Sequence, residues 1–259
     1  MPLDYKYRKP FLDKIVARLD FTEPYKMLID NLPENIRNKA LQYFPNDRSR
    51  EVVGGSVSFQ IGAGGNQDFT NTQTKFMEWR FVDAVENTLI INNTSMIFEI
   101  KRYTTFDWFN KIFMDILREI FDCKPDLQAK RLGLRYINII EVSGKKPTAW
   151  EEYLNTQLLG IFKVPSKDQS VARAFHSLVV NCPNDIRLHF QYGMHNPDFP
   201  ATIRRKVFVL DYDAYHEGVL GDLGYSEEKF VHCHNEIKLL FESSIKQKLR
   251  VLMEVIENE

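Results

Sequence analysis

The stretch RLGLRYINIIEV, residues Arg131–Val142, defines the fold more clearly than any other part of the sequence. Its β-branched and aromatic residues are typical of a β-strand. Because side chains alternate along a strand, Leu132 and Leu134 are expected to face a core, with Arg131 and Arg135 on the other side. The stretch follows a long apolar helix pattern and opens a second series of strands and helices. This order predicts that the layout of the first half is repeated.

The same layout of elements is expected twice along the chain: a strand, a short helix, a run of hairpin strands and a long helix. The first half-unit covers residues 1–122 and the second covers residues 131–259. Apolar residues at helical spacing predict the long helices near 105–121 and 226–256.

The join between the halves is short and charged, so we expect one intertwined domain over residues 1–259. The predicted fold class is α+β, with a mostly antiparallel sheet built from a duplicated β-α-β-β-β-α unit and the two long helices packed on it.

Local signals predict where several elements begin and end. Thr104 is expected to cap the first long helix, and Ser226 the second, because hydroxyl side chains accept from the orphan N–H groups of a helix start. The polar, glycine-bearing residues Gly62–Thr74 predict a loop. The strand Ile186–Tyr192 alternates apolar and polar residues, which predicts a sheet with one solvated face.

Composition and charge favour some classes of protein over others. There are 34 basic and 35 acidic residues, without the basic excess typical of nucleic-acid-binding proteins, although clusters such as Arg204–Lys206 leave that contact open. The first residues do not resemble a signal peptide, and no run reaches the ~18 apolar residues of a membrane span. Three widely spaced cysteines favour free thiols over a disulfide framework. We therefore expect a cytoplasmic protein without membrane contact.

Two arginines and two aspartates are the candidate binding residues. Arg131 and Arg135 lie on the same side of their strand, roughly 13 Å apart, and their guanidinium groups suit carboxylates and other anions. Asp211 and Asp213 lie on the same side near the end of another predicted strand. They could bind a divalent cation or pair with the two arginines. Pairing within the protein is the favoured interpretation.

Catalytic and cofactor motifs are missing from the sequence. His232 and His234 are two positions apart on a predicted helix, where side chains point about 200° apart and cannot share a metal. Gly62–Gly65 lacks the ending of a phosphate-binding loop, and no nucleophile elbow is present. We therefore predict no catalytic residue, no metal site and no cofactor, and we favour a non-enzymatic protein.

Three stretches together resemble one prokaryotic family. They are YTTFDWF at Tyr103–Phe109, RLGLRYIN at Arg131–Asn138, and LDYDAY at Leu210–Tyr215, the last followed by a long C-terminal helix that includes Phe241–Ile245 and Lys248–Arg250. The family is uncharacterised and is distributed sporadically among bacteria and archaea. The resemblance implies a shared fold, without an activity, a cofactor or a catalytic residue. Sporadic distribution is typical of mobile accessory genes, such as defence or toxin–antitoxin cassettes.

These observations lead to three functional hypotheses. The favoured one is a non-enzymatic binding protein that recognises a protein partner, encoded beside it in a defence or toxin–antitoxin cassette. The second is a receptor for a small anionic ligand, which Arg131 and Arg135 would hold in a cavity between sheet and helix. The third is a metal-dependent hydrolase built around Asp211 and Asp213. The sequence leaves the oligomeric state open.

Overall fold

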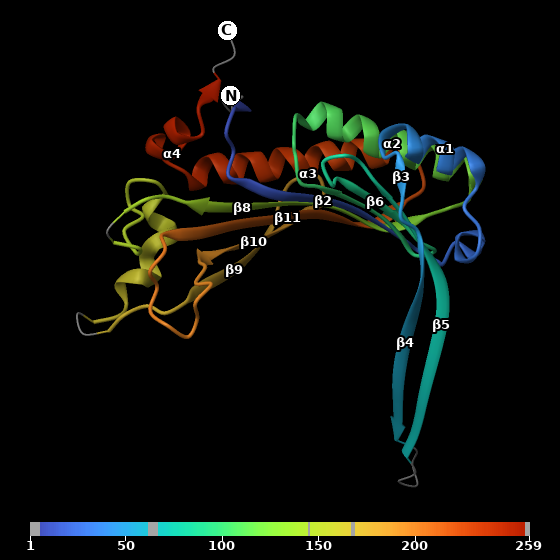
Figure 1. Ribbon diagram of the computed structural model, residues 1–259, viewed down its shortest axis with the longest axis horizontal. Coiled ribbons are helices and arrows are strands. Elements are labelled where there is room, and N and C mark those ends of the chain that lie inside the picture. Colours follow the sequence, from blue (N-terminus) through green and yellow to red (C-terminus); the bar gives the residue numbers. More distant parts are fainter. Residues whose placement is uncertain (1–5, 62–66, 145, 167–168, 257–259) are drawn as a thin grey trace. The chain divides into compact units, whose positions relative to one another are not determined.

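A computed structural model describes residues 6–61, 67–144, 146–166 and 169–256, without the side chains of residues 55–61 and 67–74. The expected α+β class is confirmed, because a mostly antiparallel sheet carries several helices (Figure 1). Two compact units divide the chain, and neither is a continuous segment. Unit 1 consists of Met1–Val16, Leu132–Glu217 and Glu227–Glu259, and unit 2 of Ala17–Arg131 and Gly218–Ser226.

Unit 2 holds an antiparallel sheet with the strand order β3-β5-β6-β7-β2, and β4 pairs with β5. Its elements are η1 (Lys26–Ile29), α1 (Glu34–Tyr43), β3 (Asn46–Asp47), β4 (Arg50–Ile61), β5 (Gln67–Val82), β6 (Thr88–Ile91), β7 (Ser95–Ile100), α2 (Phe106–Cys123) and the end of β2 (Leu12–Phe21). In its core the Phe98 ring lies 5.1 Å from that of Phe44 and 5.0 Å from that of Phe109, between centroids. These contacts join β7 to the end of α1 and to α2.

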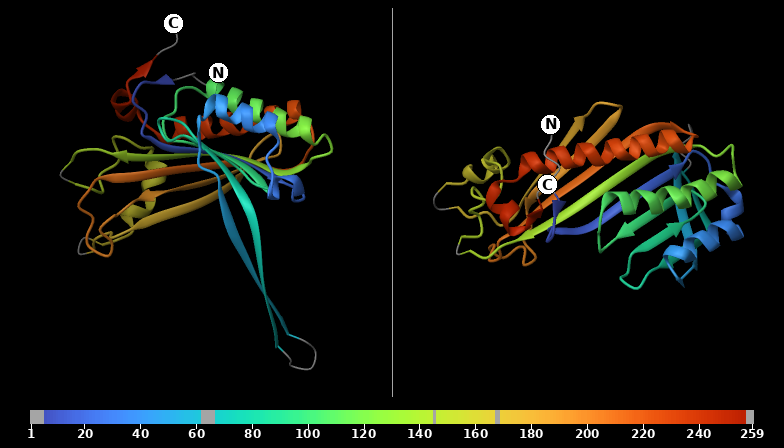
Figure 2. Two further views of the ribbon diagram at one scale, coloured as in Figure 1. Left: turned by 45° about the vertical axis from the view of Figure 1, so that its right-hand side comes forward. Right: turned by 90° about the horizontal axis from the view of Figure 1, so that it is seen from above.

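Unit 1 holds a sheet with the strand order β2-β8-β11-β10-β9 and the helix α3 (Figure 2). Its elements include β8 (Ala129–Glu141), η2 (Thr156–Lys163), β9 (Ala174–Asn181), β10 (Ile186–Met194), β11 (Val207–Leu220), α3 (Leu223–Ser244), α4 (Gln247–Leu252) and the small pair β1 (Lys6–Tyr7) and β12 (Val255–Ile256). Tyr212 stacks on Phe190 at 4.5 Å and meets Phe241 of α3 edge-on at 6.1 Å, between centroids. One face of β10 and β11 is therefore buried beneath α3.

The alternation expected for the β10 hairpin is confirmed. Ile186, Leu188 and Phe190 are buried, whereas the intervening Arg187 is exposed and His189 is half-buried. At the turn between β9 and β10, Asn184 and Asp185 have φ values of 58° and 55°, a left-handed conformation that these two residue types tolerate. Further along, a Cβ at Gly193 would lie 2.0 Å from the carbonyl oxygen of Ala174, so only glycine permits this close approach of β9.

The first long helix is confirmed, with a correction to its cap. α2 begins at Phe106, and its N-cap is Thr105, whose hydroxyl accepts from the Trp108 N–H at 3.2 Å. Thr104 was the expected cap, but it lies one residue outside this geometry. The first turn of the second long helix is stabilised by Asp222, whose Oδ1 accepts from the Tyr225 N–H at 2.8 Å, instead of by Ser226.

The second long helix does not continue to residue 256 as predicted. α3 ends at Ser244 and α4 starts at Gln247. The hydroxyl of Ser244 bonds back to the Leu240 carbonyl at 2.7 Å, and Ile245 forms a β-bridge with Leu154. A tertiary contact of the backbone thus replaces the next helical hydrogen bonds, while the apolar spacing of the sequence continues through the break.

The predicted loop at Gly62–Thr74 is wrong over its second part. β5 already begins at Gln67, which pairs with Ile61 of β4. The remaining residues, 62–66, lie outside the described part of the chain. Backbone pairing in a hairpin satisfies the N–H and C=O groups regardless of side-chain polarity, so a polar sequence can still form strands.

The strand order has a common feature in the two halves of the sequence. In the first half β2 lies next to β7, and in the second β8 lies next to β11, so each half places the strand before its short helix beside the strand before its long helix. The short second element differs, because α1 is an α-helix and η2 is a 3₁₀ helix, and β3 and β4 occur only in the first half. An internal duplication therefore stays a prediction.

Candidate functional site

The face of the unit 1 sheet opposite α3 is the candidate site, and we call it the open face. On the covered face, Tyr136 bonds to His234 of α3 at 3.0 Å between Oη and Nδ1. The open face carries the side chains of alternate residues on four strands: Arg135 and Ile139 of β8, Asp211 and Asp213 of β11, His189 and Gln191 of β10, and Phe175, Ser177 and Val179 of β9. Figure 1 shows α3 running along the other side of these strands.

Arg135 and Asp211 form a bidentate ion pair at the centre of the open face. Arg135 Nε donates to Asp211 Oδ1 at 2.8 Å, and Nη2 donates to Oδ2 at 2.6 Å. The side chain of Asp211 is 11% exposed and that of Arg135 is 43% exposed. The hydrogen bonds to Asp211 raise the pKa of Arg135, and the charge of Asp213 raises it further. The expected pairing between arginine and aspartate is confirmed for these two residues.

The other two predicted residues have different surroundings. Asp213 lies two positions beyond Asp211 on β11, opposite His189 of β10. Arg131 is half-buried on β8 and belongs to unit 2, whereas the other three belong to unit 1. Across the described ranges, no three His, Cys, Asp or Glu side chains are grouped so that they could hold a metal ion.

Ser177, His189 and Asp213 lie on three neighbouring strands and invite comparison with a catalytic triad. Ser177 Oγ lies 2.7 Å from His189 Nε2, and His189 is the register partner of Asp213. In the described part of the chain, however, Ser177 is the only side chain that forms a hydrogen bond with His189. A triad needs a carboxylate that orients the imidazole through its second nitrogen. The arrangement therefore lacks the contact that would activate the serine.

Large apolar side chains are exposed on the open face. Phe175 is 43% exposed, Val179 is 55% exposed and Ile139 is 39% exposed. The guanidinium carbon of Arg173 lies 5.5 Å from the centroid of the Phe175 ring and 5.8 Å from that of Phe199. Exposed aromatic and aliphatic residues beside arginine are characteristic of protein interfaces.

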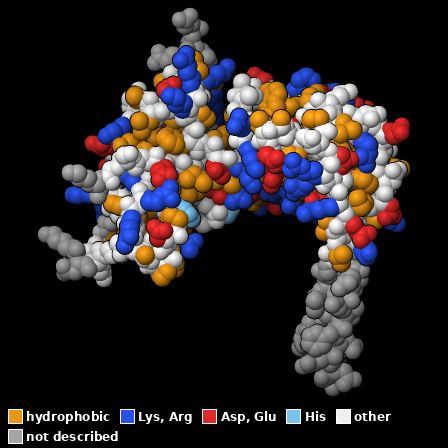
Figure 3. Space-filling model, in the orientation of Figure 1, with side chains coloured by type: hydrophobic (Ala, Val, Ile, Leu, Met, Phe, Trp, Pro, Cys, Tyr) orange, Lys and Arg blue, Asp and Glu red, His pale blue; other side chains and the backbone are white. Residues whose placement is uncertain are grey.

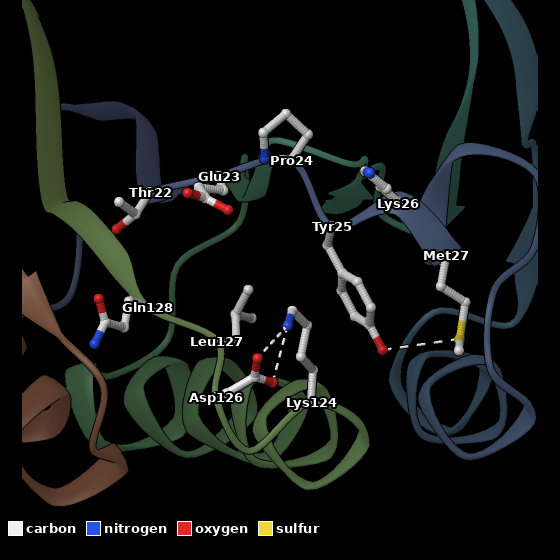
Figure 4. Close-up of a pocket in the computed structure, with 10 residues that line it drawn as sticks. All are labelled: Thr22, Glu23, Pro24, Tyr25, Lys26, Met27, Lys124, Asp126, Leu127 and Gln128. Carbon is white, nitrogen blue, oxygen red and sulfur yellow. Dashed lines mark hydrogen bonds and ion pairs between the residues drawn. The ribbon is translucent and has the colours of Figure 1, made fainter.

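One cavity lies in unit 2 and has a volume of about 560 Å³ (Figure 4). The loops around Thr22–Met27 and Lys124–Gln128 line it. Inside it, Lys124 Nζ pairs with Asp126 at 2.8 Å, and burial raises the pKa of Tyr25, as do Cys123 and Asp126 to a smaller extent. Neither Arg131 nor Arg135 is among the lining residues. The cavity therefore does not match the expected anion site.

A second cavity, of about 420 Å³, lies beside the β9–β10 turn in unit 1. Cys182, Arg187 and His216 line it together with five other residues, and Arg187 pairs with Glu217 at 3.0 Å. Burial raises the pKa of the Cys182 thiol to about 11, with Glu236 contributing further. This thiol is therefore protonated at neutral pH and is a poor nucleophile.

Comparisons with protein-family models, with curated proteins and with solved structures give no match. The family resemblance of the motifs therefore stays a proposal. Among the described helices, none is both long enough and apolar enough to cross a bilayer. Basic and acidic side chains are interspersed over the surface shown in Figure 3, in keeping with a net charge of -1.

The exposed residues of β9 are the part of the site that the sequence reasoning missed. No pattern used above places this strand at the end of the sheet. A usable signal was present, because Ala174–Asn181 contains no Lys, Arg, Asp, Glu or Pro. Edge strands usually carry such residues, so their absence could have marked this segment for attention.

Proposed function

We propose that this is a non-enzymatic binding protein that recognises a protein partner through the open face. The observation that carries the proposal is the exposure of Ile139, Phe175 and Val179 on one face around the Arg135–Asp211 pair. Burying such side chains against a partner would contribute roughly 25 cal/mol per Å² of apolar surface. The ion pair would remain paired in the complex, and its internal hydrogen bonds would offset part of the cost of removing the 43% exposed Arg135 side chain from water.

The family resemblance supports a finer proposal about the partner. Sporadically distributed genes are often neighbours of the genes with which they function, so the partner would be encoded in the same defence or toxin–antitoxin cassette. A cytoplasmic location belongs to the same proposal.

The anion-receptor alternative has less support. Arg135 Nε and Nη2 already donate to Asp211, so an incoming anion would have to compete with this carboxylate for the guanidinium charge. A metal-dependent hydrolase would need a third ligand beside Asp211 and Asp213, and none is grouped with them among the described residues.

The test is co-purification of the tagged protein with the products of its neighbouring genes, using two matched variants. Ile139→Glu places a charge on the open face, and Leu252→Glu places one on α4, where the parent residue is 44% exposed compared with 39% for Ile139. We expect Ile139→Glu to weaken partner binding about tenfold or more, and Leu252→Glu to leave it unchanged.

Two results would contradict the proposal. Equal partner binding by both variants would show that the interface does not lie on the open face. Failure of every neighbouring gene product to bind the wild-type protein would remove the support for a partner in the same cassette.

A further inference from the structure

In the described part of the chain, the β9 strand is an unprotected sheet edge. It lies at the end of the strand order and pairs there with β10 alone. Its eight residues, AFHSLVVN, include no charged residue and no proline, and Phe175, Leu178 and Val179 are 43%, 49% and 55% exposed. Monomeric proteins usually blunt such edges with lysine, proline or a covering segment, because an open edge invites another strand.

The hairpin geometry shows which backbone groups of β9 point outward. The N–H of Cys182 donates to the carbonyl of Ile186 at 2.8 Å, so these residues form a hydrogen-bonded pair. Because such pairs alternate along antiparallel strands, Val180, Leu178 and His176 also bond to β10. The N–H and C=O groups of Phe175, Ser177, Val179 and Asn181 are consequently directed away from the sheet. No other described segment pairs with that side.

We infer that a second copy of this chain occupies the edge, with two β9 strands pairing antiparallel about a two-fold axis at Ser177. In this register Ser177 faces Ser177 of the other copy. Phe175 of each copy faces Val179 of the other, so this pair forms twice. Aromatic and β-branched side chains form favourable cross-strand pairs. On the other face of the strand, Leu178 meets His176. Every large exposed apolar residue of β9 thus gains an apolar or aromatic neighbour.

The neighbouring register is less complementary. A two-fold axis at Leu178 would set Phe175 against the polar Asn181 and Val179 against Ser177, leaving both apolar residues opposite polar ones. Because β9 carries no charge, neither register is opposed by electrostatic repulsion, and the side-chain pairs decide between them.

The inferred dimer would join the open faces of two copies into one continuous sheet surface. This arrangement goes beyond the proposed partner binding, which does not depend on it. A single strand pair buries less than the ~1,200 Å² of a standard stable interface. We therefore expect an association that depends on concentration in the micromolar range.

Analytical ultracentrifugation of the full chain, from roughly 1 to 100 µM, tests the association. The wild-type protein should shift with concentration from the monomer mass of 30.5 kDa toward twice that value. Ser177→Lys and Ser177→Glu should each dimerise at least tenfold more weakly, because like charges then face each other across the axis. A mixture of the two variants should recover dimers.

A cysteine scan gives an independent measurement of the register. Under mild oxidation Ser177→Cys should form a disulfide-linked dimer, since the Cα atoms of a hydrogen-bonded antiparallel pair lie about 5.5 Å apart. Val179→Cys should crosslink only when mixed with Phe175→Cys. Wild-type protein, with its three free cysteines, is the control.

Specific outcomes would overturn the inference. A wild-type protein that remains monomeric at the highest concentration excludes the dimer, and a Leu178→Cys crosslink in place of the Ser177→Cys crosslink excludes the register. Ile139→Glu, which lies on β8 away from the edge, should dimerise normally even where it loses the partner. The two proposals can therefore fail separately.

Discussion

The two residues of the Arg135–Asp211 pair differ in their exposure to solvent. Asp211 is 8% exposed as a residue, whereas the Arg135 side chain reaches solvent. Removing the arginine leaves a buried carboxylate without its donors, whereas removing the aspartate leaves a guanidinium that water can solvate.

We therefore expect Arg135→Met to lower the free energy of unfolding by about 2 kcal/mol, and Asp211→Asn by about 1 kcal/mol. Urea unfolding measures both. The matched control is Arg187→Met, because the Arg187–Glu217 pair is about half exposed on both sides and water screens it, so its loss should change the unfolding free energy much less. Equal losses for Arg135→Met and Arg187→Met would show that the burial of Asp211 has no energetic consequence.

The Cys182 thiol provides a prediction about pH. Burial raises the pKa of this thiol from 9.0 to about 11 in the folded protein, and Glu236 makes a smaller contribution in the same direction. Because the folded pKa lies above the unfolded one, the stabilising contribution is complete below about pH 9 and is lost as the pH rises through about 11.

Alkylation by iodoacetamide, followed by mass spectrometry, checks this behaviour. At pH 8 the folded protein should modify Cys182 at least tenfold more slowly than the urea-unfolded protein, and Glu236→Gln should raise the folded rate. A Cys182 rate that is the same in folded and unfolded protein would rule out the shift.

At the scale of elements, the two adjacent threonines at the start of α2 have different roles. Thr105 accepts a hydrogen bond from the Trp108 N–H, and Thr104 is exposed just outside the helix. We expect Thr105→Ala to cost about 1 kcal/mol of unfolding free energy and Thr104→Ala less than ~0.5 kcal/mol. Chemical denaturation of the two single variants makes the comparison. The reverse ranking would restore Thr104 as the cap.

The break between α3 and α4 illustrates the limit of periodicity at this scale. The apolar positions Phe241, Ile245 and Leu249 continue at helical spacing, so sequence reasoning predicted one helix through residue 256. The Ser244 hydroxyl and the bridge from Ile245 to Leu154 end the helix instead. Spacing reports which side chains are buried, and both a continuous helix and two short ones can bury the same set.

At the scale of the whole molecule, each compact unit is assembled from separate segments of the chain. Unit 1 needs the N-terminal segment as well as β8–β11 and most of α3. A fragment beginning at Arg131 lacks the β2 residues that precede Ala17, and the edge of β8 would be left unpaired in it.

We therefore expect the fragment 131–259 to unfold at a lower urea concentration than the full chain, with a broader transition, as followed by circular dichroism. Its control is the full chain with Leu252→Glu, which changes one exposed residue and retains every segment. A fragment that matches the full chain in midpoint and cooperativity would show that the second half folds independently.

The sequence by itself determined the α+β class, the two apolar helix patterns and the solvated face of β10, and it left open whether Asp211 pairs with an arginine or binds a cation. The first three follow from the spacing of apolar residues along each segment, whereas the partner of Asp211 depends on which strand lies next to β11. Only the tertiary structure decided that β9 is the edge, that α3 ends at Ser244, and that Arg131 and Arg135 belong to different units. The physical reason is that the spacing of apolar residues along a segment encodes which of them are buried. Strand order and backbone contacts between distant segments depend instead on the whole chain.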